Sequence, residues 1–322
     1  MSAENDIIVQ PDAGETAIEY AKAVLNGTTV AGSLVKLACK RFLTDLETGE
    51  SRGFYFDIEA AQHVVDFFGF LRHTKGVWAK KAETAGFLLS LWQVFILANL
   101  FGWRRVADGS RRFREAHIEL ARKNGKSTFI AGIGLYMLFA DGEPGAEVYS
   151  AATTKEQARI VFHAAKDMVK VSPYLKSRIG IWRNNLHVDI SSSKFEPLAS
   201  ESNTLDGLNI HCGLVDELHE HPTRALYDVL QTAIGSRQQP LMLAITTAGV
   251  DREGICWAQR SIAVKLLQGT LPDDDFVGRT DNACFFGFIA TLDEKDDPWD
   301  ERNWGKANPN LVGEILERKL KS

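Results

Sequence analysis

The sequence predicts an α/β fold in which helices flank a mostly parallel sheet. Beyond residue 86, short β-prone runs alternate with helical patterns. Two of these runs, 212–215 and 241–246, are apolar apart from the terminal Thr246, which is typical of strands covered on both faces. Upstream, the apolar residues recur at helical spacing only. We therefore expect a helical N-terminal extension over 1–85, a core over 86–270, and a small C-terminal lid or linker subdomain over 271–322.

The elements can be assigned in chain order. In the extension we expect helical structure over 17–48 and over 57–71, then a Lys- and Gly-containing connection over 74–84 and a helix from about Leu91 to Gly102. In the core, strands are expected near 116–120, 147–152, 186–190, 212–215, 241–246 and 284–290, and helices over 127–139, 154–170, 222–234 and 253–267. A charged loop at 272–275 and a final charged helix complete the predicted order.

Composition excludes several classes of protein. The 322 residues carry a formal net charge of −5, so the chain has no overall basic signature for nucleic acid, and any DNA contact needs a local patch. The four cysteines, Cys39, Cys212, Cys256 and Cys284, form no CxxC pair, so we expect buried reduced thiols. The N-terminus lacks the apolar core of a signal peptide, and the apolar stretch 87–101 is too short to span a bilayer.

The strongest local pattern is ARKNGKST at 121–128, between a predicted strand and a predicted helix. A phosphate-binding loop needs inward backbone N–H groups, a helix N-terminus, one lysine and one hydroxyl. Here Arg122, Lys123, Asn124 and Gly125 form the loop, Lys126 would reach the β- and γ-phosphates, Ser127 would hold Mg²⁺, and Thr128 would add a phosphate contact. The usual pattern has a glycine where this chain has Leu120, so a simple turn before a capped helix is the alternative.

A second pattern, Leu214-Val-Asp-Glu217, is a predicted strand that ends in two carboxylates. Asp216 would hold the Mg²⁺ ion through water, and Glu217 would polarise the attacking water, which are two tasks that ATP hydrolysis requires. The alternative is that both residues only cap the next helix. The order of a lysine loop followed by an acidic strand end favours a paired Walker A and Walker B site.

Two further patterns complete the predicted site. The run LAITTAG at 243–249 ends an apolar strand in Thr246, Thr247 and Gly249, which would face the γ-phosphate and sense its loss. Gln93, upstream of the loop, has an amide that can both donate to and accept from an adenine edge. Without the other motifs, an ordinary strand exit and a solvated glutamine would be the preferred interpretations.

A metal alternative exists at His211, Asp216, Glu217, His219, Glu220 and His221. Among the histidines, only His219 and His221 are close in sequence, and two residues apart they would face different directions on a helix. No zinc-ligand spacing is matched, so Mg²⁺ on Asp216 is the preferred use of this segment.

These residues, in this order, resemble the ATPase part of bacteriophage terminase large subunits, in the branch whose loop reads RKNGKS. The resemblance covers roughly residues 17–313 and includes segments outside the loop. They are the 21–47 segment, HTKG at 73–76, WQ at 92–93, FGW at 101–103, RRFREA at 111–116, 141–158, LDGLN at 205–209, DELHEH at 216–221, ITTAG at 245–249 and ANPNL at 307–311.

The resemblance implies an additional-strand P-loop NTPase that uses Mg²⁺ and ATP to drive double-stranded DNA into a procapsid. It also implies a homo-oligomeric ring docked on the portal protein, a terminase small subunit that chooses the DNA, a place in the host cytoplasm and not in the mature virion, and no membrane. The family carries a C-terminal nuclease domain. No later acidic cluster follows here, so we expect the motor part alone, without DNA cleavage.

Related packaging ATPases supply an arginine to a neighbour's active site, in some branches just before a glycine upstream of the acidic strand. The matching position here is Asp206, before Gly207. We therefore expect the trans-acting arginine elsewhere, with Arg237 and Arg224 as candidates, whereas Arg122 would contact phosphate within its own chain.

Two other functions share parts of this pattern. A helicase-like or other DNA-dependent ATPase has the same loop and acidic pair, but usually carries further arginine motifs on a second related domain, for which this chain has no room. A nucleotide-gated assembly module would bind ATP with negligible turnover, and Glu217 argues against it because a pure binder needs no water-activating base.

Overall fold

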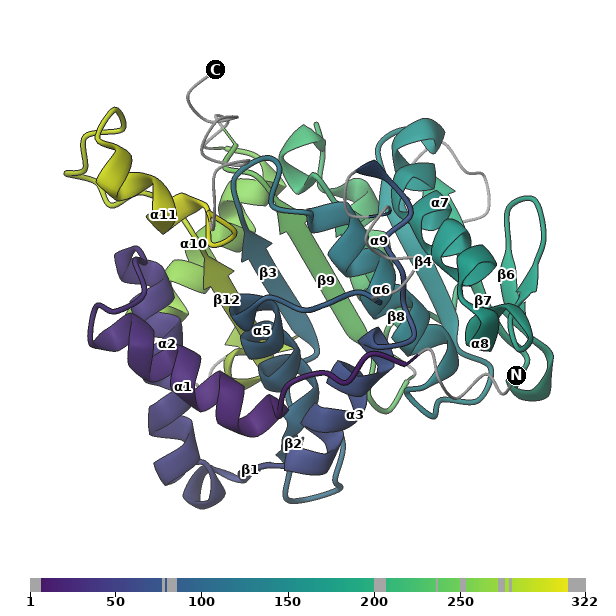
Figure 1. The fold of residues 1–322 in the computed structure, drawn as a ribbon, viewed down its shortest axis with the longest axis horizontal. Helices are drawn as coiled ribbons and strands as arrows, with labels where there is room; N and C mark the ends of the chain where they lie inside the picture. The colour runs from purple at the N-terminus through teal and green to yellow at the C-terminus, as the bar shows by residue number, and fades with distance from the viewer. Residues whose placement is uncertain are drawn as a thin grey trace.

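The computed structural model describes residues 7–76, 79, 86–199, 207–235, 237–249, 253–271, 276–277 and 280–311. Its centre is an eight-stranded sheet in the order β12-β3-β9-β8-β4-β7-β6-β5 (Figure 1). The strands are β3 (Glu115–Glu119), β4 (Glu147–Ala152), β5 (Gly180–Ile181), β6 (Leu186–Val188), β7 (Ser193–Ala199), β8 (Cys212–Asp216), β9 (Leu241–Thr246) and β12 (Phe285–Ile289).

The strands from β12 to β7 pair in parallel, whereas β6 and β5 are antiparallel at one edge. Strand β9 lies between β3, which precedes the predicted phosphate loop, and β8, which ends in Asp216. This inserted strand is what the additional-strand prediction requires. The predicted P-loop NTPase fold is therefore confirmed.

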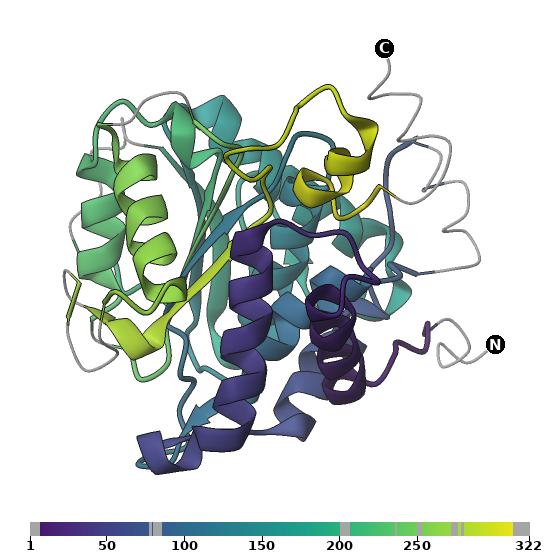
Figure 2. The ribbon, with the colours of Figure 1, turned by 90° about the vertical axis from the view of Figure 1, so that its left-hand side faces the viewer.

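Helices cover both faces of the sheet, which Figure 2 shows nearly edge-on. One face packs on α6 (Lys126–Phe139) and α7 (Lys155–Val171), the other on α9 (Ala225–Ala233) and α10 (Ile255–Leu267). Alternate residues of a strand divide between the faces, as strand geometry requires. In β9, for example, Leu243 belongs to the core on the α6 side, and Met242 and Ala244 to the core on the α9 side.

The N-terminal region is helical, as predicted, but 17–48 is not one helix. It forms α1 (Ala13–Leu25) and α2 (Ser33–Thr48), because Gly27 adopts a positive φ of 82° between them. These helices pack with α3 (Ile58–Phe68) and α5 (Leu91–Gly102) in the same apolar core as β3 and α6. The boundary expected at residue 85 stays a prediction.

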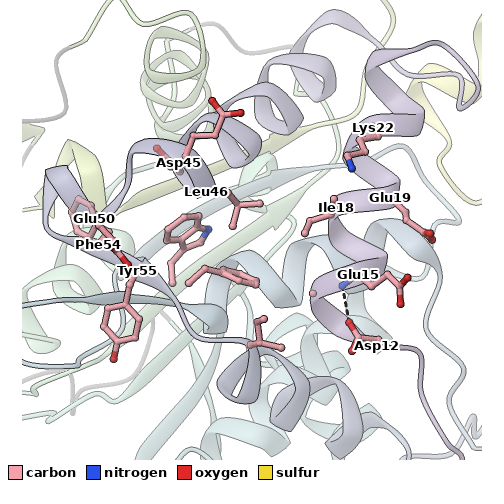
Figure 3. A pocket seen from close by; sticks show the side chains of 15 residues that line it. Asp12, Glu15, Ile18, Glu19, Lys22, Asp45, Leu46, Glu50, Phe54 and Tyr55 are labelled. Atoms are coloured by element: carbon pink, nitrogen blue, oxygen red, sulfur yellow. Dashed lines mark hydrogen bonds between the residues drawn. The ribbon is translucent and has the colours of Figure 1, made fainter.

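A hollow of about 910 Å³ lies between α1 and the end of α2 (Figure 3). Acidic side chains line it, including Glu15, Glu19, Glu47 and Glu50. None of its lining residues belongs to the predicted phosphate loop or to the strand ends of the central sheet. The hollow is therefore separate from the predicted nucleotide site.

Some strands were not predicted. Strand β7 contains Pro197, and a proline within a β-prone run argues against a strand. The two-residue strand β5 and the small pairs β1 (Phe54–Phe56) with β2 (Trp103–Arg105), and β10 (Phe276–Val277) with β11 (Thr280–Asp281), are too short for a periodic signal. Helix α9 begins at Ala225, three residues later than predicted, because the turn η4 (Leu218–Glu220) follows β8 first.

The remaining short elements are α8 (Pro173–Lys176), α11 (Trp304–Ala307) and the 3-10 turns η2 (Glu50–Arg52), η3 (Asp189–Ser191), η5 (Asn282–Cys284) and η6 (Glu301–Asn303). The predicted loop at 272–275, Asp206, much of the 74–84 connection and the helix predicted beyond Leu311 lie outside the described residues. All four cysteines are buried thiols that form no disulfide among the described residues, as predicted. No described helix is long and apolar enough to cross a membrane.

Candidate nucleotide-binding site

The loop between β3 and α6 has the backbone that a phosphate site needs. Lys123 and Gly125 adopt left-handed φ values of 68° and 74°, and Gly125 is the residue before α6 begins. Alternating right- and left-handed residues turn successive N–H groups to one side, and the helix N-terminus adds positive potential there. The loop is therefore shaped to receive an anion despite the missing first glycine.

Lys126 is a buried cation beside this loop, with 6% of its side chain exposed. Its Nζ atom lies 3.5 Å from the carbonyl oxygens of Leu120 and Ala121 and 3.6 Å from Oε1 of Glu217. These contacts are long for a charged donor, whose hydrogen bonds to anions are usually about 2.7–2.9 Å. The ammonium is thus held near the loop by weak contacts that a phosphate oxygen would replace.

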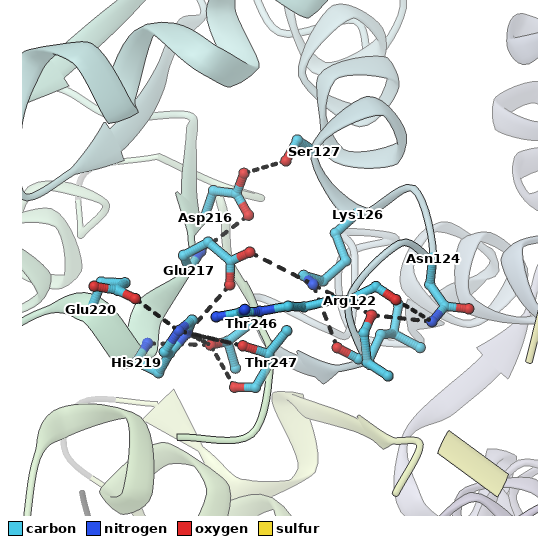
Figure 4. Close-up of polar contacts among 12 residues, drawn as sticks. Arg122, Asn124, Lys126, Ser127, Asp216, Glu217, His219, Glu220, Thr246 and Thr247 are labelled. Carbon is cyan, nitrogen blue, oxygen red and sulfur yellow. Dashed lines mark hydrogen bonds and ion pairs between the residues drawn. The ribbon is translucent and has the colours of Figure 1, made fainter. Parts of the chain in front are cut away.

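Asp216 and Ser127 provide a fitting pair for a magnesium ion. The Ser127 hydroxyl donates to Oδ2 of Asp216 at 2.5 Å, which joins the start of α6 to the end of β8 (Figure 4). Burial raises the pKa of the Asp216 carboxyl above its ordinary value, and the Ser127 hydrogen bond opposes this shift. Mg²⁺ prefers hard oxygen ligands and typically takes one or two protein groups, with phosphate and water completing the shell. This donor set matches that preference.

Glu217 lies at the mouth of the site in a strained conformation. Its φ of 51° and ψ of 52° are left-handed, which is uncommon for a residue with a side chain. The Glu217 N–H donates to the Ile245 carbonyl oxygen at 2.9 Å, and the side chain remains 38% exposed. The turn therefore aims a partly solvated carboxylate back toward Lys126, where a water-activating base would be needed.

The end of β9 lies against the same group of side chains. The Leu120 N–H donates to the Thr246 carbonyl oxygen at 3.0 Å, so the start of the loop is joined directly to the predicted coupling segment. Thr246 is fully buried and Thr247 nearly so. A Cβ atom on Gly249 would lie 3.0 Å from Cβ of His219, so a larger residue at this position would require His219 to shift.

Sequence reasoning considered His219 only as a metal ligand and did not assign it to this site. Its Nδ1 atom lies 2.9 Å from Oγ1 of Thr246 and 3.3 Å from Oε2 of Glu217. Because the Thr246 hydroxyl donates its one proton to the Thr247 carbonyl oxygen, Nδ1 of His219 must donate to Thr246. His219 is thus bonded to the coupling segment and lies in contact with the proposed base, and the sequence signal was a histidine two residues after Glu217.

His219→Ala is expected to lower ATP turnover by about 5- to 10-fold while ATP affinity stays unchanged, because the hydrogen bond to Thr246, worth about 1 kcal/mol, and the side chain that packs against the Glu217 carboxylate are both lost. His219→Asn should recover part of the turnover, since its amide can donate from a position near Nδ1. Steady-state kinetics would measure both. His163→Ala, at an exposed position on α7, is the matched control. A changed KM with unchanged kcat in His219→Ala would contradict this role.

Gln93 lies on the first turn of α5 and is only 5% exposed. Its Oε1 atom accepts from the Ser90 N–H at 2.9 Å in a capping box, and its Nε2 atom has no hydrogen-bond partner among the described residues. The Gln93 amide oxygen is thus already bonded to Ser90, and the amide N–H group is the part of the side chain that could bind an adenine edge.

The two candidates for the trans-acting arginine, Arg237 and Arg224, lie at opposite edges of the sheet. Arg237 pairs with Glu143 at 2.9 Å and donates to backbone carbonyls before β4 and β8, at the edge opposite the loop, so its position does not favour a trans-acting role. Arg224 precedes α9 on the loop's edge, and its side chain is 69% exposed beside Asp228. Arg122 is exposed and reaches across the site toward the His219 side (Figure 4).

Comparison with known proteins places this site in a family context. A family model described as the terminase large subunit ATPase domain matches residues 91–264, more than half of the chain. The match begins at α5 and ends within α10, so it contains the loop, the acidic strand end and the β9 segment.

Two curated proteins are similar over part of their length. Protein YmfN of Escherichia coli (strain K12) is 46% identical over 117 residues, which is 36% of this chain and 24% of that protein. The terminase large subunit of Enterobacteria phage HK97 is 31% identical over 148 residues, 42% of this chain and 28% of that protein.

Among solved structures, the crystal structure of the HK97 bacteriophage large terminase matches with a TM-score of 0.64 and 21% identity, over 80% of this chain and 50% of that chain. At this identity the likeness supports the fold alone. The chain matches about a quarter of the length of the two curated relatives and half of the crystallised protein.

Proposed function

The chain belongs to the terminase large subunit ATPase-domain family, and from this premise we propose that it is the ATP-hydrolysing motor that drives double-stranded DNA into a procapsid. The proposal rests on one observation: Lys126, the Ser127–Asp216 pair and Glu217 lie together at one edge of the sheet. These groups come from two elements that are about 90 residues apart in sequence, and each matches one requirement of phosphoryl transfer.

Each residue of the site has a separate role in binding or hydrolysing ATP. The loop N–H groups of 122–128 and Lys126 bind the β- and γ-phosphates, with Arg122 and Thr128 adding contacts, and Gln93 contacts the base. Ser127 and Asp216 would hold Mg²⁺, which would neutralise charge on the phosphates. Glu217 orients and deprotonates the attacking water. Thr246, Thr247 and Gly249, connected to Glu217 through His219, transmit the loss of the γ-phosphate.

The partners follow from the family. We propose a homo-oligomeric ring on the portal protein in the host cytoplasm, with a small subunit that selects the DNA and no part in the mature virion. A neighbour would supply an arginine, and the exposure of Arg224 on the loop's edge favours it over Arg237. DNA cleavage is not part of the proposal for residues 1–322.

ATP turnover per chain is expected to rise several-fold as protein concentration increases, because each site is completed by a neighbour's arginine, a group worth about 10³-fold or more in related enzymes. Arg224→Ala should remove the concentration-dependent part. The measurement is phosphate release across a dilution series, with and without linear double-stranded DNA.

Other outcomes separate the alternatives. ATP binding without turnover at any concentration would favour the assembly module. Unwinding of a forked duplex would favour a helicase-like ATPase. Turnover that is independent of concentration in both proteins would contradict the neighbour's role but leave the ATPase assignment standing.

A further inference from the structure

Three asparagines join the C-terminal segment to the phosphate loop. Asn124, in the loop, is fully buried, and its Nδ2 atom donates to Oδ1 of Asn308 at 3.1 Å. The backbone N–H of Asn310 donates to Oδ1 of Asn124 at 3.4 Å, and the Ala121 N–H donates to the Ala307 carbonyl oxygen at 3.3 Å. Residues 307–310 therefore form one wall of the loop.

Asn310 also contacts a second part of the proposed site. Its Oδ1 atom accepts from Oγ of Ser90 at 2.9 Å and from Nε1 of Trp92 at 2.7 Å. Its Nδ2 atom donates to the Asn124 carbonyl oxygen at 3.2 Å. One side chain thus links the start of α5, where Gln93 lies, to the loop that would hold the phosphates.

The chemistry of the amide makes this link rigid. An asparagine oxygen has two acceptor positions, and Asn310 uses both on α5 while its amide nitrogen serves the loop. Rotation of the side chain to release one partner would therefore release the others. One short side chain therefore ties the start of α5 to the loop, in addition to the packing of Trp92 on Phe129 of α6.

We propose that Asn310 is a positioning residue that holds the base side and the phosphate side of the site at the spacing of one nucleoside triphosphate. This inference rests on the proposed function. Contacts to the two ends of one ligand reinforce each other only when both are held in the geometry that the ligand spans. Loss of Asn310 should therefore reduce the extra affinity that ATP has over its triphosphate chain alone.

The test compares dissociation constants of Mg-ATP and of magnesium with inorganic tripolyphosphate, measured by calorimetry. In the wild type, ATP should bind more tightly. In Asn310→Ala the ratio of the two affinities should fall by about tenfold, as expected for the loss of roughly 1.4 kcal/mol of hydrogen bonding, while tripolyphosphate affinity stays within about threefold. Asn303→Ala is the matched control, since Asn303 Nδ2 bonds within its own segment, to the Asp297 carbonyl oxygen.

A second variant protects the test against misfolding. Trp92→Phe keeps an aromatic ring but removes one donor to Asn310, and it should lower the ratio by about threefold when measured well below its melting temperature, which the smaller ring at this buried position lowers. An unchanged ratio in Trp92→Phe and Asn310→Ala, or an equal loss of affinity for both ligands, would overturn the inference while leaving the ATPase proposal intact. A wild-type protein that binds neither ligand would overturn both.

Discussion

Glu217→Gln is expected to lower ATP turnover by about 10²- to 10⁴-fold while Mg-ATP binding persists. Glutamine keeps the shape of the side chain but cannot accept a proton from the attacking water. The carboxylate lies 3.6 Å from Lys126, and the left-handed conformation of Glu217 directs it toward the loop. Single-turnover hydrolysis and calorimetric binding would separate the two effects.

A matched control for Glu217 is Glu156→Gln, an exposed glutamate at the start of α7 on the same edge of the sheet. It should retain wild-type turnover. Wild-type turnover in Glu217→Gln would show that another group activates the water and that Glu217 serves only the turn.

Asp141→Leu is expected to destabilise the fold by about 3–5 kcal/mol, because it leaves a buried cation without its partner. The Asp141 carboxylate accepts both hydrogen bonds from Nη2 of Arg111, at 2.5 and 2.6 Å, and lies 2.7 Å from Nε2 of His211. The side chains of Arg111 and Asp141 are 0% and 2% exposed. The free energy of unfolding in urea would measure the loss.

Two comparisons test whether the unpaired buried charge of Arg111 causes the loss of stability in Asp141→Leu. Asp167→Ala, in an exposed pair with Lys170, should change stability by no more than about 0.5 kcal/mol. Arg111→Met combined with Asp141→Leu should be more stable than Asp141→Leu alone, since the uncompensated charge is gone. A single Asp141→Leu variant that loses less than about 1 kcal/mol would contradict the explanation.

Much of this architecture could be predicted because its signals are local or topological. The loop at 121–128 and the carboxylates at the end of β8 each follow a strand, and parallel strands bring their carboxyl ends to one edge. The break between α1 and α2 was missed although the sequence marks it, since Asn26-Gly27 is a dipeptide typical of turns and Gly32 directly precedes α2. Strand β7 was missed because Pro197 usually marks a strand's absence.

The site residues His219, Asn308 and Asn310 were missed for a different reason. His219 contacts Thr246 only because the η4 turn folds the chain back after Glu217, which shifts its side chain away from the direction that a helix would give. Asn308 and Asn310 reach Asn124 across 184 and 186 residues of sequence. Contacts of this kind depend on the path of the C-terminal segment over the loop, for which no periodic pattern exists.

The central claim is that the loop at 121–128 binds the phosphates of Mg-ATP, and calorimetric titration of Mg-ATP into wild type and Lys126→Ala tests it most directly. We expect one nucleotide per wild-type chain, weaker binding when Mg²⁺ is chelated, and an affinity about 10- to 100-fold lower in Lys126→Ala, as expected for the loss of hydrogen bonds to a charged phosphate. Equal Mg-ATP affinity in the two proteins would contradict the assignment of this loop.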